Sequence, residues 1–192
     1  FDVLCDGSFY CHLDLGVLGR HNAMNALAVA ATSWVMKIPG EAVSKGVEAF
    51  HGAGRRMEFK GTYHGAQVYD DYAHHPDELR ATLEAIRSMG DHRLVLAFQP
   101  HTYTRTKLLM DDFIRELKKA DVVVLAEIYA ARESNTIGIS SADLAAQIPG
   151  SIYCETLQDV TETLRKIVKE GDIVVTMGAG DIFRAGEALL AE

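Results

Sequence analysis

Hydrophobic positions in the first quarter of the chain follow two different spacings. Residues 1–15 alternate between apolar and polar side chains around a central Asp-Gly, which predicts a pair of strands joined by a turn. Between residues 21 and 37 the apolar positions recur every three or four residues, which predicts a helix. A second helix is expected over residues 40–50, because Pro-Gly ends the first one just before it.

The rest of the chain predicts alternating strands and helices. RLVLAF, DVVVLAE and DIVVTM are near-continuous apolar runs, typical of strands buried on both faces of a parallel sheet. Strands are predicted over residues 57–63, 66–69, 93–98, 122–126, 151–154 and 172–177, and helices over residues 76–89, 104–119, 141–148, 157–170 and 181–191. This alternation predicts a Rossmann-like α/β fold, a mostly parallel sheet flanked by helices.

A glycine-rich segment, HGAGRR, separates these two patterns. A glycine-rich stretch between periodic segments is typical of a loop, and we interpret this one as a hinge between domains. We therefore expect two domains, residues 1–53 and residues 54–192.

Composition and charge narrow the possible partners. The 192 residues are 48% hydrophobic and 24% charged, as in ordinary soluble domains, and the net charge of −8 argues against a nucleic-acid partner. No apolar run approaches the roughly 20 residues that cross a bilayer, so no membrane partner is expected. Three widely spread cysteines, Cys5, Cys11 and Cys154, predict reduced thiols and a cytoplasmic protein. The chain opens on Phe1, and we expect it to be a piece of a longer protein.

Polar and glycine-rich segments follow four of the predicted strands: YDDYAHHP, FQPHTYTR, IYAARES and MGAGD. In open α/β sheets ligands bind beyond the carboxyl ends of the strands, so these segments are expected to converge on one edge. They contribute the candidate residues Asp70, Asp71, Tyr72, His74, His75, Gln99, His101, Tyr103, Arg105, Arg132, Glu133 and Asp181.

The segment DDYAHHPDEL combines a helix start with unusual polar pairs. Its PDE letters suit the first turn of a helix, where proline needs no N–H and acidic residues complement the dipole. A carboxylate at a strand end can accept ribose hydroxyls or hold a magnesium-bound water, and a histidine can donate to a phosphate or an oxyanion. A functional interpretation is favoured for Asp71 and His74, whereas Asp70 and His75 fit a functional or a structural role equally well.

Arg105 is the candidate anion-binding residue. A guanidinium can grip a carboxylate or phosphate with two parallel hydrogen bonds, although a lone helix arginine is usually solvated. Its neighbours His101 and Tyr103 favour function. The later GAGDIF has phenylalanine where the dinucleotide fingerprint needs a third glycine, so it fits a plain strand-to-helix turn equally well.

Two asparagines and two arginines are further candidates. Asn22 and Asn25 are three residues apart and share a helix face, and their amides could bind an adenine edge. Asn22 could equally be a helix N-cap. Arg55 and Arg56 in the hinge segment could clamp a nucleotide or supply ordinary linker charge.

Six segments together resemble the Mur ligase family. GRHNAMNALA is similar to its G-x-H-N-x-x-N-x-x-A-A motif, AFHGAGRRMEFKG to its F-x-G-x-x-R-R-x-E-x-x-G junction and DDYAHHPDEL to its D-Y-A-H-x-P motif. FQPHTYTRT, EIYAARES and MGAGDI resemble, as a set, the branch that joins L-alanine to UDP-N-acetylmuramate. The match runs in the correct order over nearly the whole chain.

The resemblance implies a three-domain ligase of peptidoglycan precursor synthesis. One domain holds the UDP-sugar, a central one holds ATP on a P-loop, and the C-terminal one brings in the amino acid. With ATP and Mg²⁺ such enzymes form an acyl phosphate, which the amine attacks to give amide, ADP and phosphate. Residues 1–53 would be the tail of the central ATP-binding domain and residues 54–192 the C-terminal domain. The sequence contains no G-x-x-x-x-G-K-[ST], so we expect the chain alone to be inactive without the N-terminal and central domains, its expected partners.

The resemblance also assigns roles to single positions. It implies cofactor binding by Asn22, Asn25, Arg56 and Asp71, catalysis by His74 and Arg105, and substrate binding by Tyr72, His101, Tyr103 and Glu133, with no residue assigned to a metal. The position after His101 is often arginine in the family but is Thr102 here, which puts more weight on Arg105 as the carboxylate clamp.

Three alternatives remain open from the sequence. The first is a sister ligase that attaches a preformed peptide to the same sugar. The second is a non-catalytic Rossmann-like nucleotide-binding module. The third is a metal hydrolase that would use Asp70, Asp71, His74 and His75.

Overall fold

The structure, a computed structural model, describes residues 1–191 of the chain. It consists of two compact units, which divide between Ala53 and Gly54 inside the predicted hinge segment. Among the described residues, no helix has the length and apolar character that crossing a membrane would require.

The first unit is a β-hairpin with two helices, as the spacing predicted. β1 (Asp2–Cys5) and β2 (Ser8–His12) pair antiparallel, and α1 (Arg20–Val35) and α2 (Gly40–Glu48) follow. Its small core consists of Val3, Cys11, Leu13, Ala26, Ala30 and Val43. The helix α1 is apolar on most of its surface but buries only Ala26, Ala30 and Ser33 in this unit.

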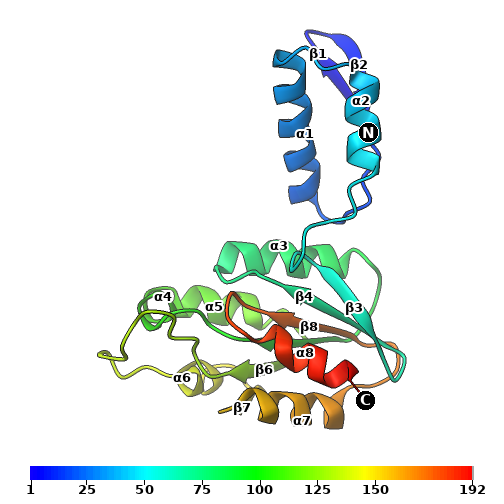
Figure 1. Cartoon of the computed structure of the whole chain (residues 1–192). Helices are drawn as coiled ribbons and strands as arrows, with labels where there is room; N and C mark the ends of the chain where they lie inside the picture. The colour runs from blue at the N-terminus through cyan, green and yellow to red at the C-terminus, as the bar shows by residue number, and fades with distance from the viewer. Residues whose placement is uncertain (192) are drawn as a thin grey trace. The chain divides into compact units, whose positions relative to one another are not determined.

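The second unit is built on a six-stranded sheet (Figure 1), and it confirms the predicted α/β fold. The strands are β3 (Glu58–Tyr63), β4 (Ala66–Asp71), β5 (Leu94–Phe98), β6 (Val122–Ala126), β7 (Ile152–Cys154) and β8 (Ile173–Met177). Their order is β3-β4-β8-β5-β6-β7; only β3 is antiparallel to its neighbour. The central strands β5 and β8 are buried at every position, as their continuous apolar runs predicted.

Helices cover both faces of this sheet. They are α3 (Pro76–Arg87), α4 (Tyr103–Leu108), α5 (Met110–Leu117), α6 (Ser141–Ala145), α7 (Leu157–Ile167) and α8 (Phe183–Leu190). Side chains of α3, α5 and α6 form one core with the sheet, and side chains of α7 and α8 form a second core on the opposite face. The sheet is therefore the middle layer of three, as Figure 1 shows for α3 and α8.

Several predicted boundaries were wrong. The single helix expected over residues 104–119 is two helices, because Leu109 leaves the helical conformation with φ −108° and ψ 22°. The last helix begins at Phe183, two residues after the predicted start. The second strand continues to Asp71, so both aspartates of the YDDY segment belong to β4 and not to a loop.

Candidate functional site

The four polar segments do meet at one edge of the sheet. Strands β4, β8, β5 and β6 are parallel, and Met177 at the end of β8 pairs in register with Asp71 and with Phe98. Phe98 in turn pairs with Leu125 near the end of β6. The carboxyl ends are thus level, and the segments that follow them emerge side by side, where ligands bind in this class of fold.

A row of aromatic rings joins three of these segments. The ring centroids of Tyr72 and His74 lie 5.5 Å apart, and those of His74 and His101 lie 5.8 Å apart. His101 in turn stacks on Tyr129 at 5.7 Å with an interplanar angle of 22°. Tyr72 and His74 from one predicted motif and His101 from another are therefore neighbours.

The ring of His74 is held in one orientation. Its Nδ1 lies 3.0 Å from the carbonyl oxygen of Tyr72 and 3.4 Å from a carboxylate oxygen of Glu78. Both neighbours are acceptors, so Nδ1 carries a proton and donates, which leaves Nε2 as the atom for a ligand. Burial alone would raise the pKa of Glu78, but the backbone N–H and the nearby ring of His74 lower it, so Glu78 stays charged.

His101 and Arg105 carry polar atoms that are buried without a partner. His101 Nδ1 and Arg105 Nη1 are both inaccessible to solvent, and neither makes a hydrogen bond within the described chain. Such groups are costly unless something satisfies them. Burial, and then the charges of Arg105 and His74, lower the pKa of His101 below its usual value. This corner of the site is suited to an anion, which would supply the missing acceptor.

Glu133 and Tyr103 lie at the start of α4. The carboxylate of Glu133 accepts a 2.9 Å hydrogen bond from the backbone N–H of Thr104 and a short one from its hydroxyl. These bonds lower the pKa of Glu133 and fasten the loop after β6 to the helix. Tyr103, the first residue of α4, is partly exposed, and Arg132 in the loop is exposed. Substrate binding by Tyr103 and Glu133 stays a prediction.

The two adjacent aspartates have different structural partners. Asp70 is 1% exposed, and it accepts a hydrogen bond of 2.8 Å from Arg55 Nε and one of 2.7 Å from the Thr176 hydroxyl. Asp71 accepts backbone hydrogen bonds of 2.9 Å from Met57 and 2.7 Å from Ala73, while burial raises its pKa. Neighbouring strand residues face opposite sides, so they do not act as a pair.

His75 has the structural role that the sequence left open. It is the N-cap of α3, where its side chain accepts from the backbone N–H of Asp77 at 3.3 Å and Glu78 completes the capping box. His75 therefore has a structural role as a helix cap. Asp70 also has a structural role, because it is bonded to Arg55 and Thr176. Within residues 1–191, the histidine, cysteine and acidic side chains form no group that could hold a metal ion.

The glycines of MGAGD are explained by close approach. A Cβ on Gly178 would lie 2.6 Å from the Gln99 carbonyl oxygen, and one on Gly180 would lie 2.7 Å from Cγ of Tyr129. The side chain of Gln99 donates to Asp181 at 3.0 Å and accepts from the backbone N–H of Ile182 at 3.1 Å. The turn after β8 is thus locked onto the segment after β5.

Arg55 has a structural role that the sequence did not indicate. Its guanidinium binds Asp70 and the carbonyl oxygens of Gly178 and Gly180. All of these partners are distant in sequence, so no local pattern predicts them. Its neighbour Arg56 is exposed, with its guanidinium 5.6 Å from the Tyr72 ring centroid.

The asparagine candidates lie in the first unit, on α1. The expectation that Asn22 could be the N-cap was wrong, because the cap of α1 is Gly19. Asn22 donates instead to the carbonyl oxygen of Leu18 at 2.7 Å, and Asn25 is exposed. Their predicted adenine contact stays a prediction.

Known proteins match both parts of the chain. The family model described as Mur ligase, glutamate ligase domain, matches residues 55–180. The UDP-N-acetylmuramate–L-alanine ligase of Lachnospira eligens is 46% identical over 99% of this chain, which corresponds to 42% of that protein. The chain therefore spans about two fifths of the length of the curated relatives that it matches.

Two solved structures are similar over both units. The UDP-N-acetylmuramate-alanine ligase of Thermotoga maritima is 28% identical with a TM-score of 0.80, and the match covers 96% of this chain and 40% of that one. A murein peptide ligase of Psychrobacter arcticus is 25% identical with a TM-score of 0.69, and the match covers 93% of this chain and 38% of that one.

Proposed function

The chain belongs to the Mur ligase family, and from this premise we propose that its parent protein joins L-alanine to UDP-N-acetylmuramate with consumption of ATP. The observation that carries the proposal is the 46% identity, over 99% of the chain, to a relative named for that activity. The buried, unpartnered atoms of His101 and Arg105 support it independently, because the amino acid brings a carboxylate.

We assign the amino-acid side of the reaction to the edge formed by His74, His101 and Arg105. Arg105 Nη1 and His101 Nδ1 hold the carboxylate of the incoming amino acid. His74, fixed through Nδ1, accepts at Nε2 the proton that the attacking amine loses, and the imidazolium so formed donates a hydrogen bond from Nε2 to the oxyanion. Holding the amine beside the activated carbonyl removes much of the entropic barrier to amide formation. Tyr72 and Tyr103 would line the same side.

Nucleotide contacts are proposed for each unit separately, by Asn22 and Asn25 in the first unit and by Arg56 and Asp71 in the second. Asn22 and Asn25 share a helix face, and their amides can donate to and accept from adenine. The exposed guanidinium of Arg56 suits a phosphate of the nucleotide. Asp71 stays the predicted contact to the nucleotide's ribose. The described residues offer no metal-binding group, so no step is assigned to Mg²⁺.

We further propose that residues 1–53 are the tail of a central ATP-binding domain and residues 54–192 the C-terminal domain. The helix α1 leaves Leu27, Val29, Trp34 and Val35 between 37% and 78% exposed. Exposed apolar side chains of this size belong in a larger core, which another part of the parent protein would supply. The three free cysteines suit a cytoplasmic protein.

The test is phosphate release by the full-length parent enzyme with ATP and UDP-N-acetylmuramate. L-alanine, a panel of other amino acids and the cell-wall tripeptide are supplied in separate reactions. We expect release that depends on L-alanine. Release that depends only on the tripeptide would replace the proposal with the peptide-attaching ligase, the alternative favoured by the likeness to the murein peptide ligase. Nucleotide binding without release would favour the non-catalytic module.

A further inference from the structure

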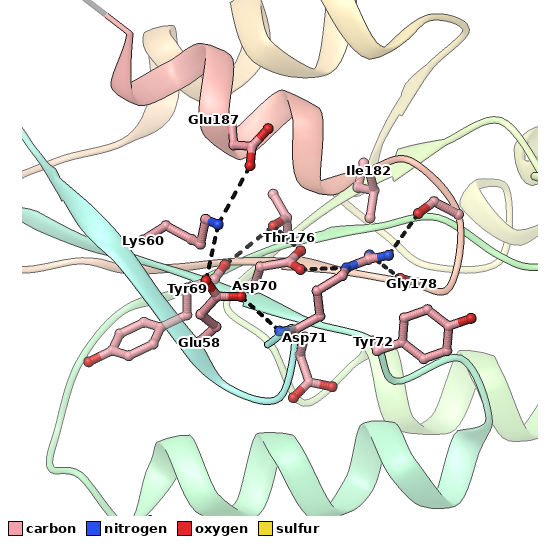
Figure 2. Close-up of polar contacts among 12 residues, drawn as sticks. Glu58, Lys60, Tyr69, Asp70, Asp71, Tyr72, Thr176, Gly178, Ile182 and Glu187 are labelled. Atoms are coloured by element: carbon pink, nitrogen blue, oxygen red, sulfur yellow. Dashed lines mark hydrogen bonds and ion pairs between the residues drawn. The ribbon is translucent and has the colours of Figure 1, made fainter. Parts of the chain in front are cut away.

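Three hydrogen bonds leave the guanidinium of Arg55 in three directions. Nε donates to Asp70 at 2.8 Å, Nη2 to the carbonyl oxygen of Gly178 at 2.7 Å and Nη1 to that of Gly180 at 3.1 Å. In Figure 2 the dashed lines from Asp70 and Gly178 run to this same guanidinium. One side chain therefore ties the end of β4 to the turn after β8.

Two aromatic rings flank the same guanidinium. Its central carbon lies 5.0 Å from the ring centroid of Tyr72 and 4.6 Å from that of Phe183. Both distances are within the range of attraction between a cation and a ring face. Tyr72 is 37% exposed, and its ring contacts the guanidinium of Arg55 besides His74 and Arg56.

The backbone of Arg55 is also fixed. Its N–H donates to a carboxylate oxygen of Glu58 at 2.7 Å, and its carbonyl accepts from the N–H of Tyr72 at 2.7 Å. It adopts φ 57°, a left-handed conformation that non-glycine residues rarely occupy. Such a conformation persists only where the surroundings determine it, as these bonds do.

Asp70 keeps the side chain of Arg55 in place. It is 1% exposed, and its second oxygen accepts from the Thr176 hydroxyl at 2.7 Å. Without Arg55 a buried carboxylate would lose its counter-ion, which is strongly unfavourable. The arginine, 25% exposed, is therefore held at this position in the absence of any substrate.

We infer that Arg55 is a positioning residue for the proposed reaction: it sets the ring of Tyr72 and the Gly178–Gly180 turn at the edge where the amino acid binds. This inference rests on the proposed function for the identity of the substrate. The guanidinium of Arg55 contacts both the Tyr72 ring and the carbonyl oxygens of the turn. Arg55 also fixes the chain one residue after Gly54, at the start of the second unit.

The chain contains a matched control at the other end of the sheet. Arg93 donates to Asp172 at 2.8 Å and to the carbonyl oxygen of Ile167 at 3.2 Å. The arginine is 33% exposed and the aspartate 3%, close to the values for Arg55 and Asp70. Asp172 lies just before β8, whereas the Gly178–Gly180 turn of the candidate site lies just after it. A lysine at either position keeps the charge but loses the planar fork.

The experiment compares Arg55→Lys with Arg93→Lys in the full-length enzyme. We expect both to lower the melting temperature, but only Arg55→Lys to reduce kcat/KM for L-alanine, by roughly 10- to 100-fold, the range for a small misplacement of reacting groups. Hydrogen exchange over residues 178–183 should be faster only in Arg55→Lys. Equal kinetic effects of the two variants, or unchanged exchange in Arg55→Lys, would overturn the inference.

Two further measurements keep the inference testable. If Arg55→Lys does not fold, Phe183→Leu removes one ring from the stack and leaves all three hydrogen bonds; we expect a smaller reduction of kcat/KM in the same direction, and no reduction would count against the inference. If the wild-type enzyme gives no alanine-dependent phosphate release, the proposed function fails. The exchange data for Arg55→Lys then still decide whether Arg55 fixes the turn.

Discussion

The imidazole rings of His74 and His101 lie 5.8 Å apart between centroids, although they follow different strands, β4 and β5. Burial, followed by the charges of Arg105 and His74, lowers the pKa of His101. Two neighbouring histidines and an arginine would repel one another if all were charged. The lowered pKa favours a neutral His101 in the free site, and a bound carboxylate would raise that pKa.

The first prediction concerns this pH dependence. His101 in the folded protein should titrate below the usual histidine value, and its pKa should rise when a carboxylate binds beside Arg105. Because the native state then binds fewer protons than the unfolded chain, stability should fall as the pH drops from the usual histidine value through the lowered one. NMR titration with and without L-alanine measures both pKa values. His101→Gln should remove this part of the acid sensitivity; an identical pH profile would contradict it.

The second prediction concerns Arg105. Replacing it with alanine removes a charged hydrogen-bond donor worth about 1.5–3 kcal/mol, so KM for L-alanine should rise on the order of 10- to 100-fold. Arg105→Lys should recover part of the loss, because it keeps the charge. Arg80→Ala is the control, since Arg80 forms an ion pair with the exposed Asp77 on α3. Steady-state kinetics with varied L-alanine makes the comparison, and unchanged kinetics in Arg105→Ala would remove Arg105 from the substrate site.

The third prediction concerns Gly180. A Cβ there would lie 2.7 Å from Cγ of Tyr129 and would also overlap the side-chain oxygen of Gln99. Gly180→Ala should therefore destabilise the protein by about 1–3 kcal/mol, the usual cost of overpacking. At Gly54 a Cβ would meet nothing closer than 3.8 Å, so Gly54→Ala should stay within about 0.5 kcal/mol of wild type. Denaturant unfolding measures both, and equal stabilities would show that the turn can yield.

The fourth prediction separates two roles of Asp71. Asp71→Asn leaves one accepting oxygen, that of the amide, for the two N–H groups of Met57 and Ala73, so stability should fall by about 1–3 kcal/mol. If Asp71 also contacts the nucleotide, KM for ATP should rise as well. Asp172→Asn is the control, because Asp172 is equally buried and binds the N–H of Lys169 and Arg93. A KM for ATP that changes no more than in the control would leave Asp71 a purely structural role.

The sheet was predictable because its strands have local signatures. RLVLAF carries five buried residues and DIVVTM six, and their length and composition identify them without any knowledge of neighbours. The convergence of His74 and Arg105 then followed from parallel strand direction alone. The break at Leu109 was missed, because Leu108 and Leu109 continue an apolar pattern although Leu108 is 82% exposed.

The contacts of Arg55 were not predictable from local sequence. Its acceptors on Gly178 and Gly180 are backbone carbonyls, which leave no mark in a sequence. The paired aspartates were misleading for the opposite reason. Asp70 and Asp71 are adjacent letters, but β4 extends through both, and a strand turns them to opposite faces.

The position of β8 in the sheet has a consequence for biosynthesis. This strand is the last of the chain, yet it lies between β4 and β5 and forms hydrogen-bonded ladders with both. Until residues 173–177 leave the ribosome, β3-β4 and β5-β6-β7 are two separate half-sheets, each with an unpaired edge. A nascent chain that stops short of residues 173–177 therefore exposes two aggregation-prone strand edges, and it is this strand that joins the two half-sheets into one.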